Sequence, residues 1–336
     1  MKYHSSRKSI KFTDKEILKL LGREERKVDL KDIKERVLIT GGAGSIGSEL
    51  ARKLISLSAE VLIVDWYENG LFQISQELGK QATYKIADVK SPAMKKILKD
   101  FKPETIIHAS AYKHVPLMQE NPLEAFNNNV GGVMNMIKLS KAENFVLVST
   151  DKAVNPSSYM GMTKRLCELA VENAGGISVR FGNVIQSNGS VVNTWLKQIE
   201  EGKNLTVTHK KIRRYFMSKN EAVSLILKAK EIGEQGSIYW LDMGELYSVY
   251  ELAEKLIEKT KSDSGIEIVG LRKGEKMIEE LDMVKEKTED DSVYKIKECF
   301  KNKKRVPEVL EKFLVKSLQY KVGDKDVVYL FKKLGL

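Results

Sequence analysis

A glycine-rich segment between two apolar stretches constrains the fold of this chain more than any other feature. Residues 36–40 (R-V-L-I-T) predict a buried strand, and residues 41–47 (G-G-A-G-S-I-G) lead from it into an amphipathic stretch that predicts a helix. Gly41, Gly44 and Gly47 permit a tight turn and let the backbone approach a pyrophosphate at the helix N-terminus, where free N–H groups favour anions. The segment therefore predicts a strand, a phosphate-binding turn and a helix in succession.

The next apolar run ends at an acidic residue. Asp65 closes the run E-V-L-I-V-D and lies 24 residues after Gly41 (65 − 41), about where an acid binds the ribose hydroxyls of a dinucleotide. A carboxylate at this position would repel a 2′-phosphate, so we expect NAD rather than NADP as the cofactor. The other expected cofactor contacts are Ser45, Ile46, Glu68, Asn69, Asp88, Val89, Ala109, Ala111, Lys113, Asn129 and Lys164.

Predicted strands and helices alternate through the first half of the chain. Residues 83–88, 105–111, 145–148 and 176–184 read as strands, with helical patterns between them. This alternation predicts an α/β fold with a doubly wound parallel sheet of the Rossmann type. We expect an N-terminal arm over residues 1–34, an NAD-binding domain over 35–188 and a mainly substrate-binding lobe over 189–336, with some segments of the lobe packing back on the first domain.

Polar residues gather directly after the predicted strand 145–148. Thr150, Asp151 and Lys152 follow it, and a serine then precedes a helix that begins near residue 159. Met160 and Lys164 are four residues apart and share one face of that helix. Because open α/β sheets bind ligands beyond the carboxyl ends of their strands, we expect these residues to form a catalytic centre.

Composition and charge exclude several classes of function. The net charge is +11, but the lysines are spread along the chain among many glutamates, so we expect no nucleic-acid partner. Cys167 and Cys299 form no disulfide framework, and no Cys/His spacing predicts a metal site. The sequence has no apolar run of the ~18 residues that a membrane span requires, and no signal-peptide pattern. We therefore expect a cytoplasmic protein without a bound metal.

Several motifs together resemble the extended short-chain dehydrogenases/reductases. More narrowly, they are similar to the UDP-N-acetylglucosamine 4,6-dehydratases of polysaccharide biosynthesis, whose substrate is a UDP-sugar. The motifs are T-G-G-A-G-S-I-G-S-E-L, A-Y-K-H-V-P-L-M-Q-E-N-P-L-E-A, S-T-D-K-A-V-N-P, M-G-M-T-K-R, R-F-G-N-V, R-R-Y-F-M and G-L-R-K-G-E-K. The resemblance implies that these proteins' fold, NAD dependence and homo-oligomeric assembly extend to this chain.

One position departs from the usual pattern of this superfamily. Most members carry Tyr-x-x-x-Lys, whereas this chain has Met160 in the register of the tyrosine. Tyr159 is five residues from Lys164, which places it ~140° away around the helix, compared with ~40° for a residue four positions away. A methionine here resembles the branch that retains the configuration at C5 of the sugar.

The resemblance implies a reaction in three parts: oxidation at C4, elimination of water across C5–C6, and return of hydride to C6. Lys164 is expected to hold the nicotinamide ribose, and Thr150 to hydrogen-bond the C4 oxygen. Asp151 is the expected acid for the C6 hydroxyl, and Lys152 is the expected base for the C5 proton if burial and Lys164 lower its pKa. The base for the C4 hydroxyl stays open. The expected substrate-binding residues are Lys113, His114, Asn183, Thr206, Thr208, Arg214, Arg272 and Glu275.

Two other functions are compatible with these motifs. The first is another nucleotide-sugar enzyme on the same fold, either a C5-inverting 4,6-dehydratase or a 4-epimerase. Met160 disfavours an epimerase, since epimerases depend on the tyrosine, and the sequence Thr150-Asp151-Lys152 favours elimination. The second is an NAD-binding scaffold without activity, which the intact Asp151, Lys152 and Lys164 disfavour.

Overall fold

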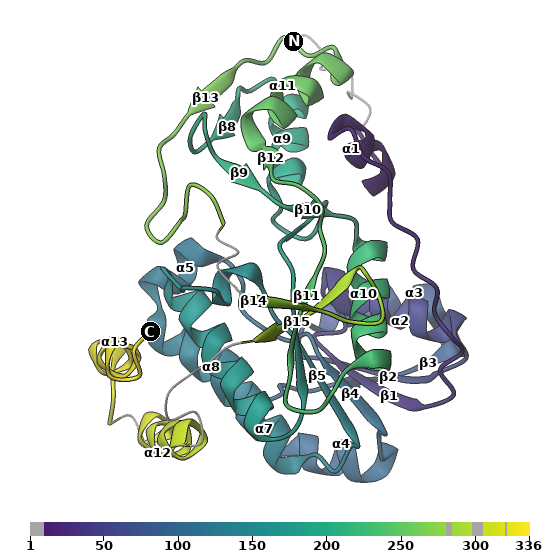
Figure 1. Ribbon diagram of the computed structural model, residues 1–336, viewed down its shortest axis with the longest axis vertical. Coiled ribbons are helices and arrows are strands. Elements are labelled where there is room, and N and C mark those ends of the chain that lie inside the picture. The colour runs from purple at the N-terminus through teal and green to yellow at the C-terminus, as the bar shows by residue number, and fades with distance from the viewer. Residues whose placement is uncertain (1–9, 280–283, 298–304, 320) are drawn as a thin grey trace, which may run out of the picture.

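The computed structural model describes residues 10–279, 284–297, 305–319 and 321–336, and a nine-stranded sheet forms its centre (Figure 1). Seven neighbouring strands are parallel, and two antiparallel strands extend one edge. The order reverses between β1 and β4, as in doubly wound sheets, so the predicted fold class is confirmed. In spatial order the strands are β14 (Val284–Lys287), β15 (Val293–Lys297), β11 (Ile238–Leu241), β6 (Ile177–Arg180), β5 (Asn144–Val148), β4 (Thr105–His108), β1 (Arg36–Thr40), β2 (Glu60–Asp65) and β3 (Ala82–Ile86).

Helices cover both faces of the sheet because its central strands are apolar on both sides. Val37 and Ile39 of β1 pack against one helical layer, and Leu38 between them packs against the other. The first layer contains α2 (Ser45–Ser56), α3 (Glu68–Leu78) and α10 (Lys219–Ile232). The second contains α4 (Ala93–Phe101), α7 (Gly131–Leu139) and α8 (Tyr159–Asn173). Short elements lie between the strands and these helices. In chain order, η1 (Gly79–Gln81) lies between α3 and β3, and α5 (Val115–Glu120) and α6 (Pro122–Ala125) lie between β4 and α7.

Two predicted elements are interrupted in the structure. The helical stretch that precedes β5 contains a π-helical turn, η2 (Phe126–Val130), between α6 and α7. The strand predicted over residues 176–184 divides into β6 and β7 (Asn183–Val184). β7 leaves the main sheet and pairs with β10 (Phe216–Met217), while the carbonyl of Phe181 still accepts the N–H of Asp151, just beyond β5.

A smaller lobe has its own core around Trp195 and Leu252. It contains α9 (Val191–Glu200), α11 (Val249–Thr260) and two small sheets. One sheet pairs β8 (Leu205–Val207) with β13 (Ile266–Ile268), and the other pairs β9 (Arg213–Arg214) with β12 (Tyr247–Ser248). The N-terminal arm spans both cores: α1 (Asp14–Leu20) buries Ile17 and Leu18 in the small-lobe core, whereas Val28, Leu30 and Ile33 pack against the core of the main sheet.

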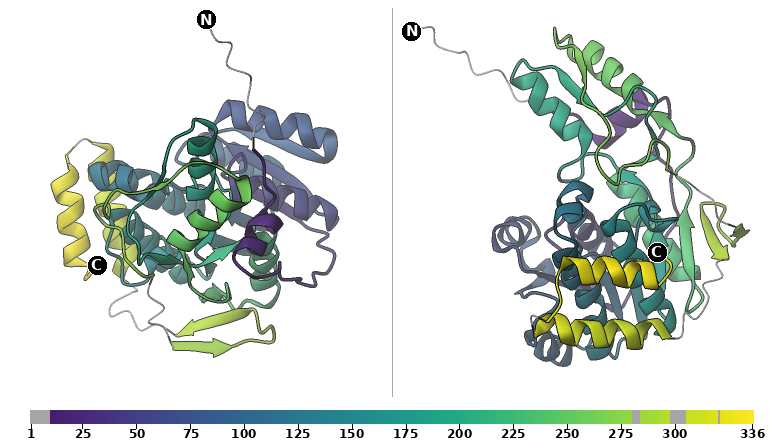
Figure 2. Two further views of the ribbon diagram at one scale, coloured as in Figure 1. Left: turned by 90° about the horizontal axis from the view of Figure 1, so that it is seen from above. Right: turned by 90° about the vertical axis from the view of Figure 1, so that its left-hand side faces the viewer.

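Segments from the second half of the chain return to the main sheet. β11 joins it directly, and the β14–β15 hairpin, which the sequence pattern did not predict, extends its edge. Two C-terminal helices, α12 (Val306–Leu318) and α13 (Asp324–Lys333), pack beside α8 (Figure 2). The domain boundary at residue 188 stays a prediction.

Three further observations concern only the described residues. No helix among them has the length and apolar character that crossing a membrane requires. They contain no group of three or more His, Cys, Asp or Glu side chains placed to hold a metal ion. Cys167 is buried with a free thiol, and Cys299 lies outside the described residues.

Candidate active site

A cleft of about 810 Å³ lies beyond the carboxyl ends of β1, β4 and β5, where the sheet meets the smaller lobe. Many predicted site residues line it: Gly41, Gly44, Ser45, Ile46, Gly47, Ala109, Ala111, Lys113, His114, Thr150, Lys152, Met160, Lys164, Asn183, Arg214, Arg272 and Glu275. The other predicted residues lie outside its lining: Asp65, Glu68, Asn69, Asp88, Val89, Asn129, Asp151, Thr206 and Thr208.

The glycine turn forms one end of the cleft. Gly41 has a φ of +68°, and a Cβ there would lie 2.7 Å from the carbonyl carbon of Ala109. A Cβ on Gly47 would lie 2.2 Å from the carbonyl oxygen of Gly41, so α2 can approach the turn only with glycine at this position. Gly44 is the N-cap of α2 and has no side chain to cap the first turn, whose N–H groups therefore suit an anion.

Asp65 ties the glycine turn to the end of β2. Its Oδ2 accepts the N–H of Ala43 and its Oδ1 accepts the N–H of Tyr67, each at 2.9 Å. These two hydrogen bonds hold the carboxylate at the edge of the turn. Of the other predicted contacts nearby, Glu68 and Asn69 begin α3 with exposed side chains, Asp88 follows β3 and Val89 is buried.

Small residues and a buried amide shape the loop after β4. Ala109 and Ala111 line the cleft. Asn129 lies in the π-helical turn η2, where its Oδ1 accepts the N–H of Tyr112 at 2.7 Å and its Nδ2 donates to the Tyr112 carbonyl at 3.1 Å. Asn129 therefore fixes the backbone of this loop and does not itself line the cleft.

Helix α8 presents two of the predicted residues to the cleft. The hydroxyl of Ser158 caps the helix by accepting the N–H of Gly161 at 3.2 Å. Met160 and Lys164 line the cleft, as their spacing predicts. Tyr159 lies on the other side of the helix, where its ring stacks on Phe331 of α13 at 5.9 Å.

Lys164 and His108 are two buried titratable groups near this face of α8. Lys164 donates to the carbonyl of Val148 at 2.7 Å, and burial lowers the pKa of Lys164. His108 ends β4 with its Nδ1 2.9 Å from the hydroxyl oxygen of Thr40. Burial, together with the nearby Lys164 charge, lowers the pKa of His108 to about 3, so the imidazole is neutral near pH 7.

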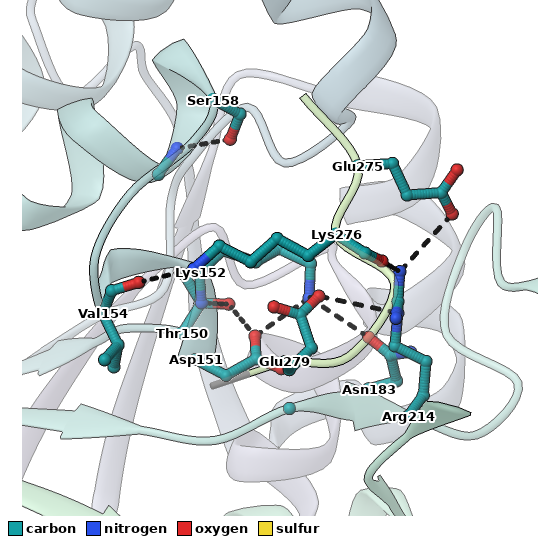
Figure 3. A network of polar contacts seen from close by, with 12 residues as sticks. Thr150, Asp151, Lys152, Val154, Ser158, Asn183, Arg214, Glu275, Lys276 and Glu279 are labelled. Atoms are coloured by element: carbon teal, nitrogen blue, oxygen red, sulfur yellow. Dashed lines mark hydrogen bonds and ion pairs between the residues drawn. The ribbon is translucent and has the colours of Figure 1, made fainter. Parts of the chain in front are cut away.

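The polar residues after β5 form a compact network in η3 (Asp151–Ala153) and the residue before it (Figure 3). The hydroxyl of Thr150 donates to Asp151 Oδ1 at 2.8 Å, and Lys152 Nζ donates to the same oxygen at 2.9 Å. Lys152 Nζ also lies 3.3 Å from Oε1 of Glu279 and donates to Oδ1 of Asn183 at 3.4 Å. One ammonium group is thus shared between two carboxylates.

The expectation that the pKa of Lys152 is lowered is wrong for this arrangement. Burial lowers it, but the negative charges of Asp151 and Glu279 outweigh burial and raise the pKa of Lys152 above its ordinary value. Arg214 opposes them to a smaller extent, and Lys164 is not among the principal influences. Lys152 is therefore an ammonium ion here, and its use as a base requires a change in its surroundings.

Glu279 is a site residue that the sequence analysis missed. It lines the cleft, is 4% exposed, and its Oε1 lies 3.5 Å from Nε of Arg214. Arg214 also donates to the carbonyls of Lys276 and Met277, at 2.6 and 3.1 Å. The only local signal was that Glu279 follows the G-E-K motif by a few residues in a segment without clear periodicity.

Of the other predicted substrate contacts, Lys113, His114, Arg272 and Glu275 line the same cleft, and Thr206 and Thr208 do not. Lys113 donates to the hydroxyl of Ser187 at 3.3 Å, and burial lowers its pKa and that of His114. Thr208 donates to Glu275 Oε1 at 3.3 Å, while Arg272 lies exposed on the rim. Thr206 is hydrogen-bonded to Gln198 within the smaller lobe, away from the cleft.

Related proteins match most of this chain. The family model described as polysaccharide biosynthesis protein matches residues 37–300. The capsular polysaccharide biosynthesis protein CapD of Staphylococcus aureus is 39% identical over 292 residues, which are 79% of this chain and 49% of that protein. The probable polysaccharide biosynthesis protein EpsC of Bacillus subtilis is 42% identical over 287 residues, 78% of this chain and 48% of that protein. The chain spans about half the length of these two relatives.

Solved structures share the same architecture. Pen from Bacillus thuringiensis superposes with a TM-score of 0.69 at 31% identity, over 74% of this chain and 82% of that chain. DesIV, a dTDP-glucose 4,6-dehydratase from Streptomyces venezuelae solved with NAD and TYD, gives a TM-score of 0.67 at 20% identity, over 74% of this chain and 88% of that chain. The second likeness concerns the fold alone. The chain belongs to the polysaccharide biosynthesis protein family and has the fold of the extended short-chain dehydrogenases/reductases.

Proposed function

We propose that this protein is an NAD-dependent 4,6-dehydratase that converts UDP-N-acetylglucosamine into its 4-keto-6-deoxy derivative. One observation carries the proposal. Thr150 and Lys152, with Asp151 hydrogen-bonded to both, lie beside the same cleft as the glycine turn and Lys164. The proposed reaction combines a reversible oxidation by NAD with an elimination of water. It therefore requires a proton donor and a proton acceptor next to the dinucleotide-binding turn.

The residues at the glycine turn fit NAD. A Cβ at Gly41 or Gly47 would clash with backbone atoms of the turn and its neighbours, so the tight turn requires glycine there, and the uncapped N-terminus of α2 suits a diphosphate. Asp65 at the end of β2 would accept hydrogen bonds from the ribose. When bound there, NAD would accept a hydride from C4 of the sugar and return it to C6.

Four residues divide the chemistry at the sugar. The buried Lys164 supplies a fixed positive charge beside the nicotinamide ribose, and Thr150 orients the C4 oxygen. Asp151 donates a proton to the C6 hydroxyl, because hydroxide is a poor leaving group. Lys152 removes the C5 proton once it has lost its own. The two groups share a hydrogen bond of 2.9 Å, so they can act on neighbouring carbons.

Residues around the lobe side of the cleft would hold the UDP moiety. Arg214 and Arg272 supply guanidinium groups for the diphosphate, and Asn183 supplies an amide. Glu275, which accepts a hydrogen bond from Thr208, would supply a carboxylate to the uridine ribose. Arg214 can bind a diphosphate only by exchanging some of its present contacts with residues 275–279.

A specific observation disfavours the 4-epimerase alternative. Met160 lines the cleft at the position where the superfamily pattern has a tyrosine, and the adjacent Tyr159 packs against Phe331 on the opposite side of α8. An epimerase would therefore lack the tyrosine of the Tyr-x-x-x-Lys pattern. A C5-inverting dehydratase would use the same Thr150, Asp151 and Lys152, and differs only in the product.

Mass spectrometry after incubation with UDP-N-acetylglucosamine and NAD⁺ tests the proposal. We expect a sugar nucleotide lighter by one water without net formation of NADH, and proton NMR of that product then gives the configuration at C5. Unchanged mass with a new sugar signal would indicate an epimerase. Unchanged substrate, with UDP- and dTDP-hexoses also unreacted, would leave NAD binding without activity as the better interpretation.

A further inference from the structure

Glu279 links two cations that face the cleft. Its Oε1 lies 3.3 Å from Lys152 Nζ and 3.5 Å from Arg214 Nε (Figure 3). Asp151 contacts Lys152 from the opposite side at 2.9 Å. Lys113, from the loop after β4, adds a further positive charge that interacts with Lys152. The charge on Lys152 is therefore set by two carboxylates that favour it and by Arg214 and Lys113, which oppose it.

The proposed elimination needs a different distribution of protons from the one in this network. The acid, Asp151, must carry a proton, and the base, Lys152, must not. Both conditions are met when one proton moves from Nζ of Lys152 to Oδ1 of Asp151 along their hydrogen bond. An N–H bond breaks, an O–H bond forms, and the electron pair stays on nitrogen as the lone pair that attacks the C5 proton. The total number of protons does not change.

The surroundings divide into groups that favour and oppose this transfer. Asp151 is 2% exposed, and its Oδ2 has no hydrogen-bond donor among the described residues. A buried carboxylate oxygen without a hydrogen-bond donor costs free energy, and the transfer removes the charge from that carboxylate. Glu279 opposes the transfer, because its charge stabilises the ammonium form of Lys152.

We propose that Glu279 is a positioning residue that determines whether Asp151 or Lys152 carries their shared proton, an inference that rests on the dehydratase function proposed above. While Glu279 contacts Lys152, the proton stays on nitrogen and the site is inactive. When Glu279 moves away, the proton passes to Asp151, and the acid and the base form together.

The segment just before Glu279 is hydrogen-bonded to Arg214, which is proposed above to bind the diphosphate of the substrate. Arg214 holds the carbonyls of Lys276 and Met277, so a diphosphate that draws on the Arg214 guanidinium changes the anchoring of this segment. The segment also contacts the active-site loop, because Lys276 Nζ donates to the carbonyl of Asn155 at 2.8 Å. We therefore expect binding of the substrate's diphosphate to Arg214 to release Lys152 from Glu279.

Labelling of the Lys152 amine in the ligand-free protein tests this role without turnover. The rate of acetylation by trace acetic anhydride, measured by mass spectrometry of the Lys152 peptide between pH 7 and pH 12, gives its apparent pKa. We expect Glu279→Gln to lower that value by about one unit or more, since an opposite charge at this distance shifts a pKa by about that amount. Glu275→Gln is the matched control, because Glu275 contacts Arg214 but has no contact with Lys152 among the described hydrogen bonds and ion pairs.

An unchanged Lys152 titration in a folded Glu279→Gln protein would overturn the proposal. Glu279→Asp, which keeps the charge, should shift the titration less than Glu279→Gln, and equal melting temperatures would show that both variants fold. In turnover assays the basic limb of kcat against pH should move to lower pH in Glu279→Gln by the same amount. A shifted titration in a protein that leaves UDP-N-acetylglucosamine unreacted would support the role of Glu279 in holding the proton and reject the dehydratase function, whereas dehydration with an unshifted titration would do the reverse.

Discussion

Two clusters of alternating charge lie at the carboxyl ends of β5 and β6, and they differ in how tightly they are held. In the first, Glu168 of α8 accepts four hydrogen bonds: from the Ser149 hydroxyl at 2.6 Å, from Arg180 at 2.7 and 2.6 Å, and from Arg165 at 3.1 Å. Glu168 and Arg180 are both 0% exposed. Ser149, Arg165, Glu168 and Arg180 form the buried cluster.

The second set, the cleft cluster, consists of Asp151, Lys152, Glu279 and Arg214. Its two contacts to Glu279 are 3.3 and 3.5 Å long, and the Lys152 side chain is 24% exposed. Short, multiple contacts in a fully buried place fix one arrangement, because any alternative leaves a charge without a partner. Longer contacts beside a cleft allow partners to be exchanged. The comparison indicates that the buried cluster holds the ends of β5 and β6 in place, whereas the cleft cluster has the freedom that its proposed catalytic role requires.

The largest expected effect separates activity from stability within the cleft cluster. Asp151→Asn keeps the shape of the side chain and removes the acid, so turnover should fall by a factor of about 10²–10⁴. Lys152 retains Glu279 as a partner, so the melting temperature should change little. Product formation followed by mass spectrometry gives the first quantity and thermal unfolding gives the second. Turnover within tenfold of the unsubstituted protein would exclude Asp151 as the acid.

The reverse pattern is expected in the buried cluster. Glu168→Gln leaves the buried Arg180 without a counter-charge, which should reduce the free energy of unfolding by about 3–5 kcal/mol. Urea unfolding measures this loss. Glu279→Gln is the matched control, and it should reduce the free energy of unfolding by less than Glu168→Gln does, because Lys152 keeps Asp151 and Arg214 keeps its backbone carbonyls. Equal losses in the two variants would contradict the distinction between the clusters.

The third prediction concerns the buried His108 and the pH dependence of the free energy of unfolding. His108 has a folded-state pKa of about 3 against an ordinary value of 6.5, so below pH 6.5 the unfolded chain binds a proton that the folded protein does not. Its stabilising contribution is therefore complete above pH 6.5 and is lost as the pH falls toward 3. From pH 7 to about pH 4.5 this amounts to about 2.5 kcal/mol.

Replacing His108 by leucine should remove this part of the pH dependence. Urea unfolding of both proteins at several pH values gives the two slopes, and the difference between them is the readout, whatever the absolute stability of the variant. Parallel slopes would mean that the imidazole is protonated in the folded protein.

The parts of the site that could be predicted from the sequence depend on local spacing. The glycine turn, Asp65 at the end of β2, and Met160 with Lys164 on one helix face follow from the geometry of one strand or one turn of helix. Thr150–Lys152 follow β5 directly. In each case a few consecutive residues determine the position of the side chain, so the sequence pattern was sufficient.

The parts that were missed depend on contacts between distant segments. Glu279 reaches Lys152 only because Arg214, from β9, holds the carbonyls of the segment before it. Glu279 also adds to the charge of Asp151, the sequence neighbour of Lys152, in raising the pKa of Lys152, whereas a role as the base required a lowered pKa. The β14–β15 hairpin was missed for a similar reason, since its edge strand V-K-E-K becomes a strand by pairing with β15 rather than through its own apolar pattern.

The smallest expected effect concerns Tyr159, the first residue of α8, whose ring packs against α13. Tyr159 precedes Met160, which lines the cleft, yet its ring stacks on Phe331 at 5.9 Å with an angle of 19° between the planes. Tyr159→Phe keeps the ring and that contact. We therefore expect turnover to change by less than about twofold, within the range of a substitution that touches no reacting group.

Tyr159→Phe is informative because the same substitution would be severe if the tyrosine served the cleft. Loss of a group that transfers a proton reduces turnover by a factor of about 10²–10⁴, and an effect of that size would mean that α8 turns during catalysis to bring the hydroxyl past Met160. Product formation by the variant, measured beside Asp151→Asn, separates the two cases. A near-silent Tyr159→Phe would exclude the Tyr159 hydroxyl from the acid–base chemistry, and would be consistent with a packing role for the side of α8 that faces α13.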